Sequence, residues 1–107
     1  MQWLYIVKPA RPEILTSGPT PEEAASVGRH FAYWGQLCKE GTALVVGRTQ
    51  TTGPETMGIA IFRATDAAAA RKIAEADPAV VDGVFKMELQ PYFVALLGDP
   101  EPFRPTA

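Results

Sequence analysis

Apolar and polar residues along the chain predict four strands, two helices and one short helical turn. The predicted strands are rich in aromatic and β-branched residues, and the predicted helices begin at capping residues. In chain order the elements are a strand over 2–8, a helix over 21–40, strands over 43–48 and 57–63, a helix over 66–76, a helical turn over 78–82 and a strand over 84–90. This order predicts the α+β fold called ferredoxin-like (βαββαβ), a four-stranded antiparallel sheet with two helices on one face.

Local signals mark the ends of the first helix. Thr20 can cap the helix, Pro21 suits its first position, and Glu23 stands where a capping box needs a carboxylate. Gly41 suits the left-handed conformation that commonly ends a helix. The preceding residues, 9–20, contain several prolines and a Ser-Gly pair, and they predict an irregular loop.

The predicted strands have apolar residues on both faces of the sheet. In the first strand, Leu4 and Ile6 point to one face, and the apolar residues that alternate with them point to the other. Two helices cover only one face, which would leave a large exposed apolar patch. We therefore expect a homodimer in which a second copy covers this face. Residues 1–92 form the predicted domain, and the tail over 93–107, apolar at its start, is expected to brace the dimer.

Composition and charge give no indication of a nucleic-acid, membrane or metal partner. The 107 residues suit one domain, and a formal net charge of −2 without a run of Lys or Arg gives no basis for binding nucleic acid. The apolar N-terminal run is too short to span a bilayer, so we expect a cytoplasmic protein without a membrane partner. Cys38, the one cysteine, allows no internal disulfide, and its place on a helix stripe predicts a buried side chain. No metal-ligand spacing is present, so we expect no metal site.

His30 is the one histidine of the chain and lies in the aromatic-rich part of the first helix. A helical wheel places it at the edge of an apolar stripe. That stripe is centred on Val27 and contains Phe31, Trp34 and Cys38. Histidine changes charge near neutral pH. At this position it is either a structural group satisfied by a hydrogen bond or a reactive one.

Asp77 is the second candidate for chemistry. It precedes Pro78, so it can simply cap the short helical turn that follows. A capping carboxylate still has a second oxygen that can hold a histidine. In the predicted topology the end of the second helix and the middle of the first lie on the same side of the sheet. A pair between His30 and Asp77 is therefore possible.

Three further residues are candidates for binding a substrate. Arg48, at the end of the second strand, could hold a substrate carboxylate with two hydrogen bonds, although an exposed arginine at a hairpin end is the simpler interpretation. Tyr5 and Trp34 could line an apolar pocket, although aromatic residues at such spacing are more often part of a core.

Several segments resemble one known family. They are His30 after Pro-Glu-Glu, Lys39-Glu40-Gly41-Thr42-Ala43-Leu44, Gly58-Ile59-Ala60-Ile61-Phe62, Ala76-Asp77-Pro78-Ala79-Val80-Val81-Asp82-Gly83 and Glu88-Leu89-Gln90-Pro91-Tyr92. In these segments the chain resembles the YCII-related (YciI-like) family of the dimeric α/β-barrel superfamily. The resemblance implies a homodimer and an active site in which His30 and Asp77 pair in a cleft at the subunit boundary.

With this resemblance, we expect a cofactor-independent lyase or isomerase that acts on a small organic acid. A neutral His30 oriented by Asp77 is a competent general base for a proton next to a carbonyl, and its conjugate acid can return the proton. The alternative is a non-catalytic dimer that binds a small molecule or assists a partner enzyme. Isomerisation or elimination would follow from the first hypothesis, whereas the second requires no turnover.

Overall fold

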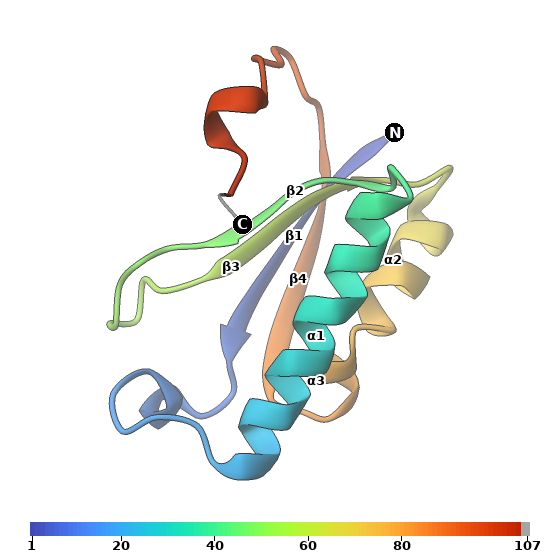
Figure 1. Cartoon of the computed structure of the whole chain (residues 1–107). Coiled ribbons are helices and arrows are strands. Elements are labelled where there is room, and N and C mark those ends of the chain that lie inside the picture. Colours follow the sequence, from blue (N-terminus) through green and yellow to red (C-terminus); the bar gives the residue numbers. More distant parts are fainter. Residues whose placement is uncertain (106–107) are drawn as a thin grey trace.

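The computed structural model describes residues 1–105 and has two layers, a four-stranded antiparallel sheet and the helices on one of its faces (Figure 1). The strands are β1 (Gln2–Pro9), β2 (Ala43–Arg48), β3 (Gly58–Arg63) and β4 (Phe85–Tyr92), and the helices are α1 (Pro21–Lys39), α2 (Ala67–Glu75) and α3 (Pro78–Val81). The strand order in the sheet is β2-β3-β1-β4. The α+β ferredoxin-like fold predicted from the sequence is confirmed.

Helix α1 begins and ends at the predicted signals. The Thr20 side chain accepts a hydrogen bond from the Glu23 N–H at 3.1 Å, and the Glu23 carboxylate accepts one from the Thr20 N–H at 2.8 Å. This reciprocal capping box satisfies two N–H groups that a helix start otherwise leaves without partners. After the helix, Gly41 has a φ of +76°, in the left-handed region that favours glycine.

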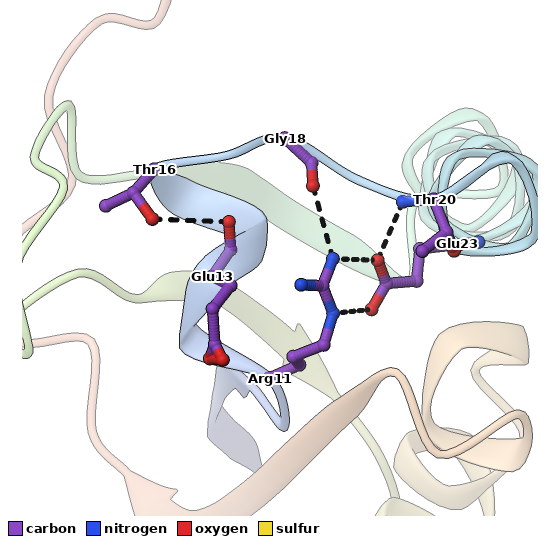
Figure 2. A network of polar contacts seen from close by, with 6 residues as sticks. All are labelled: Arg11, Glu13, Thr16, Gly18, Thr20 and Glu23. Carbon is purple, nitrogen blue, oxygen red and sulfur yellow. Dashed lines mark hydrogen bonds and ion pairs between the residues drawn. The ribbon is translucent and has the colours of Figure 1, made fainter.

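The loop over 9–20 is fastened to the start of α1 (Figure 2). The Arg11 guanidinium donates two hydrogen bonds to the Glu23 carboxylate, at 2.6 and 3.0 Å, and a third to the Gly18 carbonyl oxygen at 3.2 Å. The loop also contains a 3₁₀ turn over Pro12–Leu15. The same carboxylate therefore caps the helix and holds the preceding loop in place.

The core lies between the helices and the central strand β1, which pairs with β3 on one side and β4 on the other. Alternation along β1 turns Tyr5 toward the helices, where it is buried against Trp34 with ring centroids 4.8 Å apart. The buried apolar residues of this core are Trp3, Tyr5, Val7, Trp34, Ala43, Ala60, Phe62, Ala70 and Ala74. Small alanines on α2 let this helix approach the sheet closely.

The opposite face of the sheet carries an apolar band, and α1, α2 and α3 all lie on the other face (Figure 1). Leu4 lies opposite Ile61 and Ile6 opposite Ile59, while Ile61 also lies opposite Val45 on the edge strand β2. Val45 is 47% exposed. The band therefore crosses three neighbouring strands, as the alternation of apolar residues predicts.

The orientation of α1 differs from the helical wheel. Phe31 is 77% exposed and Cys38 is also exposed, so the prediction of a buried Cys38 is wrong. The residues that face the sheet include Ser26, His30 and Trp34, spaced at one-turn intervals. His30 therefore lies on the buried stripe rather than at its edge. The side of α1 that faces the sheet carries the donors to the buried Asp77 carboxylate, which Phe31 and Cys38 cannot supply.

The tail after β4 packs weakly against the rest of the chain. One hydrogen bond to the body of the protein, from the Val94 N–H to Gln2 Oε1, measures 3.4 Å. The large apolar side chains of the tail that are exposed are Phe93, Leu96, Leu97 and Phe103. Within residues 1–105, no helix is both long enough and apolar enough to cross a membrane.

Candidate active site

Asp77 occupies the junction between α2 and α3, where the chain must start a new helical turn. Its Oδ1 accepts a hydrogen bond from the Ala79 N–H at 2.9 Å, which is the capping bond expected of an Asp before Pro78. The side chain is fully buried. A buried carboxylate is costly unless its other oxygen is also satisfied.

The second oxygen of Asp77 accepts three side-chain hydrogen bonds. Tyr5 Oη lies 2.5 Å from Oδ2, His30 Nδ1 lies 2.6 Å away and Trp34 Nε1 lies 2.9 Å away. Tyr5 comes from β1, whereas His30 and Trp34 stand one turn apart on α1. Packing of α1 on the sheet thus brings donors from two elements onto one buried oxygen.

These contacts determine the charge of the cluster. Burial raises the pKa of Asp77, but the hydrogen bonds from His30, Tyr5 and Trp34 together outweigh this effect and hold the pKa below its ordinary value. Burial raises the pKa of Tyr5, and the hydrogen bond to the Asp77 carboxylate raises it further. At neutral pH the cluster therefore contains an ionised carboxylate and a protonated tyrosine hydroxyl.

An ionised Asp77 also selects the tautomer of His30. A carboxylate can only accept hydrogen bonds, so His30 Nδ1 must carry the proton of the 2.6 Å contact. In the neutral imidazole the lone pair is then on Nε2. The His30 side chain is 16% exposed, and its ring meets Phe85 of β4 edge-on with centroids 5.1 Å apart. The hydrogen bond to Asp77 and the contact with Phe85 thus fix the orientation of the imidazole ring.

The structure brings together four of the five residues singled out from the sequence. His30, Asp77, Tyr5 and Trp34 form one hydrogen-bonded cluster, and Tyr5 and Trp34 are buried within it. Arg48 is exposed at the end of β2 and makes no hydrogen bond to the cluster within the described residues. Nothing in the sequence indicated that Tyr5 and Trp34 would donate to the carboxylate, because such donation depends on tertiary packing.

A polar hollow of about 430 Å³ lies near this cluster. Its wall includes Ser26, which stands one turn before His30 on α1. Each of its two arginines, Arg11 and Arg29, already forms an ion pair with a carboxylate. A second hollow, of about 420 Å³, lies between the loop over 9–20 and the turn between β2 and β3. In the described part of the chain, His30 lines neither hollow.

A family model for the YCII-related domain matches residues 1–90. The chain belongs to the YCII-related family. The matched region contains β1, β2, β3 and most of β4, together with the whole His30–Asp77 cluster. It ends before the apolar tail. No group of three or more His, Cys, Asp or Glu side chains among the described residues of this YCII-related protein could hold a metal ion.

Among solved structures, the chain is similar to 5-chloro-2-hydroxyhydroquinone dehydrochlorinase from Burkholderia phenoliruptrix AC1100, in complex with 2,5-dihydroxybenzoquinone. The two are 22% identical, with a TM-score of 0.63, and the match covers 87% of this chain and 94% of the dehydrochlorinase. At this identity the similarity establishes a shared fold. No curated protein matches the sequence significantly.

Proposed function

We propose that this YCII-related protein is a cofactor-independent lyase or isomerase in which His30 is the general base and Asp77 orients it. The observation that carries the proposal is the 2.6 Å contact between His30 Nδ1 and a fully buried Asp77. This contact leaves Nε2 as the basic nitrogen of an imidazole that is already oriented. General bases of this kind contribute about 10²–10⁴-fold to a rate.

The reaction begins when His30 Nε2 takes a proton from a carbon next to a carbonyl of a small organic acid. The electron pair of the broken C–H bond forms a carbon–carbon double bond. In elimination this bond forms toward the neighbouring carbon, whose leaving group departs with its own bonding pair. In isomerisation it forms toward the carbonyl carbon while the carbonyl π pair moves to the oxygen, which gives an enolate. The imidazolium then returns its proton to the other face of the same carbon or, in a conjugated enolate, to a more distant carbon, and the C=O bond re-forms. The Asp77 carboxylate stabilises the imidazolium between these steps.

The similar solved structure supports this class of reaction. Its name states a dehydrochlorination, which is an elimination, and its bound molecule is a small oxygen-bearing ring. In this chain, we assign the binding of a substrate carboxylate to Arg48, whereas Tyr5 and Trp34, each 1% exposed, are assigned to holding the Asp77 carboxylate and not to lining the pocket. A cytoplasmic location stays a prediction.

A homodimer is part of the same proposal. The apolar band that contains Leu4, Ile61 and Val45 has no helix over it, and a second copy of the chain offers an identical band to cover it. The band lies on the face of the sheet opposite His30, so this contact does not itself form the cleft over His30 that the resemblance implies. In this arrangement the apolar tail over 93–107 braces the contact between subunits.

Ligand screening followed by kinetics tests the proposed activity. Small carboxylic acids and hydroxylated quinones are screened for a rise in melting temperature, because a ligand of the folded state stabilises it. Compounds that bind are then assayed for turnover. His30→Gln is expected to lower turnover at least about 100-fold. Cys38→Ser, at an exposed position of the same helix, is the control and keeps full activity.

Full turnover by His30→Gln would exclude His30 as the base. A separate outcome favours the alternative function, a non-catalytic dimer that binds a small molecule or assists a partner enzyme. The observation behind this alternative is the low exposure of His30, 16% of its side chain. It predicts a ligand that binds wild type and His30→Gln equally well and that neither protein converts.

A further inference from the structure

We propose that Tyr5 is a positioning residue that sets the proton affinity of His30 by donating to the same oxygen of Asp77. The inference concerns the base named in the proposed function and rests on it for its catalytic meaning. Its physical content, the titration of His30, can be measured without a substrate.

Four donors surround the Asp77 carboxylate, and three of them share one oxygen. Its two oxygens together offer about four lone-pair sites. Tyr5, His30 and Trp34 donate to Oδ2, and the Ala79 N–H donates to Oδ1. Each neutral donor draws negative charge toward itself and away from the imidazole. Asp77 therefore stabilises a protonated His30 less than a carboxylate bonded to histidine alone would.

Tyr5 has the shortest contact to Oδ2, at 2.5 Å. Hydrogen bonds from a hydroxyl to an ionised oxygen are stronger than those between neutral groups. Because its raised pKa keeps Tyr5 protonated, this donor is present throughout the pH range in which a histidine titrates. The hydrogen bond from Tyr5 to Oδ2 is therefore present whether His30 is protonated or neutral.

Few other charged groups can produce the same effect. Within residues 1–105, the titratable and charged groups on the elements around His30 are Tyr5 on β1, Arg29 and Tyr33 on α1, Asp77 at the start of α3 and Asp82 at its end. Arg29 and Asp82 form an ion pair with each other at the surface. Strand β4 presents the apolar ring of Phe85 to His30, and its charged residues Lys86 and Glu88 are exposed.

Tyr33 provides a matched control. Tyr33 is half-buried, and its hydroxyl is also a hydrogen-bond donor. It donates to the Ile73 carbonyl oxygen at 2.7 Å and not to Asp77. Its ring packs edge-on against Trp34 with centroids 5.6 Å apart. Tyr33→Phe therefore removes the same chemical group, from a similar environment, without changing the donors on the carboxylate.

The test is an NMR titration of the His30 ring protons, which are unambiguous because the chain has one histidine. Tyr5→Phe is expected to raise the titration midpoint by about half a pH unit to one unit, the equivalent of one ordinary hydrogen bond. Tyr33→Phe is expected to leave the midpoint at the wild-type value. An unchanged or lowered midpoint in Tyr5→Phe would overturn the proposal, and so would an equal rise in Tyr33→Phe.

A second measurement covers the case in which Tyr5→Phe does not fold. In a Tyr33→Phe/Tyr92→Phe background, Tyr5 is the one remaining tyrosine, so growth on 3-fluorotyrosine labels it alone. The fluorinated phenol is more acidic and donates more strongly, and the His30 midpoint is expected to fall. A rise or no change would overturn the proposal. Turnover that survives His30→Gln would instead contradict the proposed function and leave the titration result intact.

Discussion

His30 and Trp34 stand one turn apart on α1, and both donate to the same oxygen of Asp77, at 2.6 and 2.9 Å. Tyr5 reaches that oxygen from β1. One buried carboxylate therefore connects the central strand, the long helix and the α2–α3 junction. The contact that makes His30 a candidate base lies on the side of α1 that faces the sheet.

Asp77→Asn is expected to lower the free energy of unfolding by about 3 kcal/mol or more, because the substitution weakens or removes hydrogen bonds to four donors around a buried carboxylate and leaves donors unsatisfied. The amide nitrogen of the variant would also face donors. Urea unfolding at pH 7 measures the loss. Asp82→Asn is the control, because Asp82 bonds to Arg29 and Ser26 in a partly exposed position, and a much smaller loss is expected. Equal losses would contradict the central role of Asp77.

Glu23→Gln tests the pH dependence of stability. The hydrogen bond from Arg11, with that from the Thr20 N–H, lowers the pKa of Glu23 to about 2. A lowered pKa in the folded state adds stability above the ordinary value of 4.5, and this stability is lost as the pH falls toward 2. Wild type is therefore expected to be more stable than Glu23→Gln at pH 7, with the difference shrinking below about pH 4.5.

Urea unfolding of both proteins across this pH range provides the measurement. Glu22→Gln serves as the control, because Glu22 is the exposed neighbour of Glu23 and forms no ion pair within residues 1–105. A wild-type advantage that persists unchanged down to pH 2.5 would show that the carboxylate of Glu23 does not contribute through its charge. High salt is expected to reduce the advantage at pH 7, since Arg11 and Glu23 are partly solvated.

Two glycine-to-alanine substitutions are expected to change the free energy of unfolding in opposite directions. Gly28 lies within α1 with no atom within 4 Å of an added Cβ, so Gly28→Ala should raise stability by about 0.5–1 kcal/mol. Gly41 has a φ of +76°, so Gly41→Ala should lower stability by about 1 kcal/mol. Thermal and urea unfolding compare the two. A loss in both variants would mean that the outer face of α1 is covered in the assembled protein.

The proposed dimer is tested by sedimentation velocity. Ile61→Asp puts a charge in the apolar band and is expected to convert a wild-type dimer to a monomer with an unchanged circular dichroism spectrum. Phe31→Asp, on the exposed side of α1, is the control and should remain dimeric.

Removal of residues 93–107 is expected to weaken the dimer without abolishing it, as a bracing role requires. A monomeric wild type would contradict the dimer. Dissociation caused by Phe31→Asp rather than Ile61→Asp would place the contact on the helices.

Much of the fold follows from local signals that need no tertiary context. Thr20 and Glu23 form the capping box that their spacing predicts, and Gly41 ends α1. Alternation along the strands correctly separates the face that carries Tyr5 from the face that carries Leu4. Such signals succeed because capping and pleating involve neighbours a few residues apart.

The site could be predicted only as a possibility. The Asp-Pro pair indicated that Asp77 caps a helix. The distance between Asp77 and His30 could not be predicted, because the two residues are 47 positions apart in the chain and meet only through tertiary packing. The helical wheel wrongly predicted that Phe31 and Cys38 are buried, because it ranks positions by hydrophobicity. The wheel has no information about a buried acceptor on another element.

The sequence by itself therefore determined the order of the elements, their ends and the two apolar faces of the sheet, since these depend on backbone propensity and on periodicity. Only the tertiary structure decided how α1 is rotated and which side chains meet Asp77. A buried carboxylate must be satisfied, and the donors that satisfy it, Tyr5, His30 and Trp34, become neighbours only when the helix packs on the sheet.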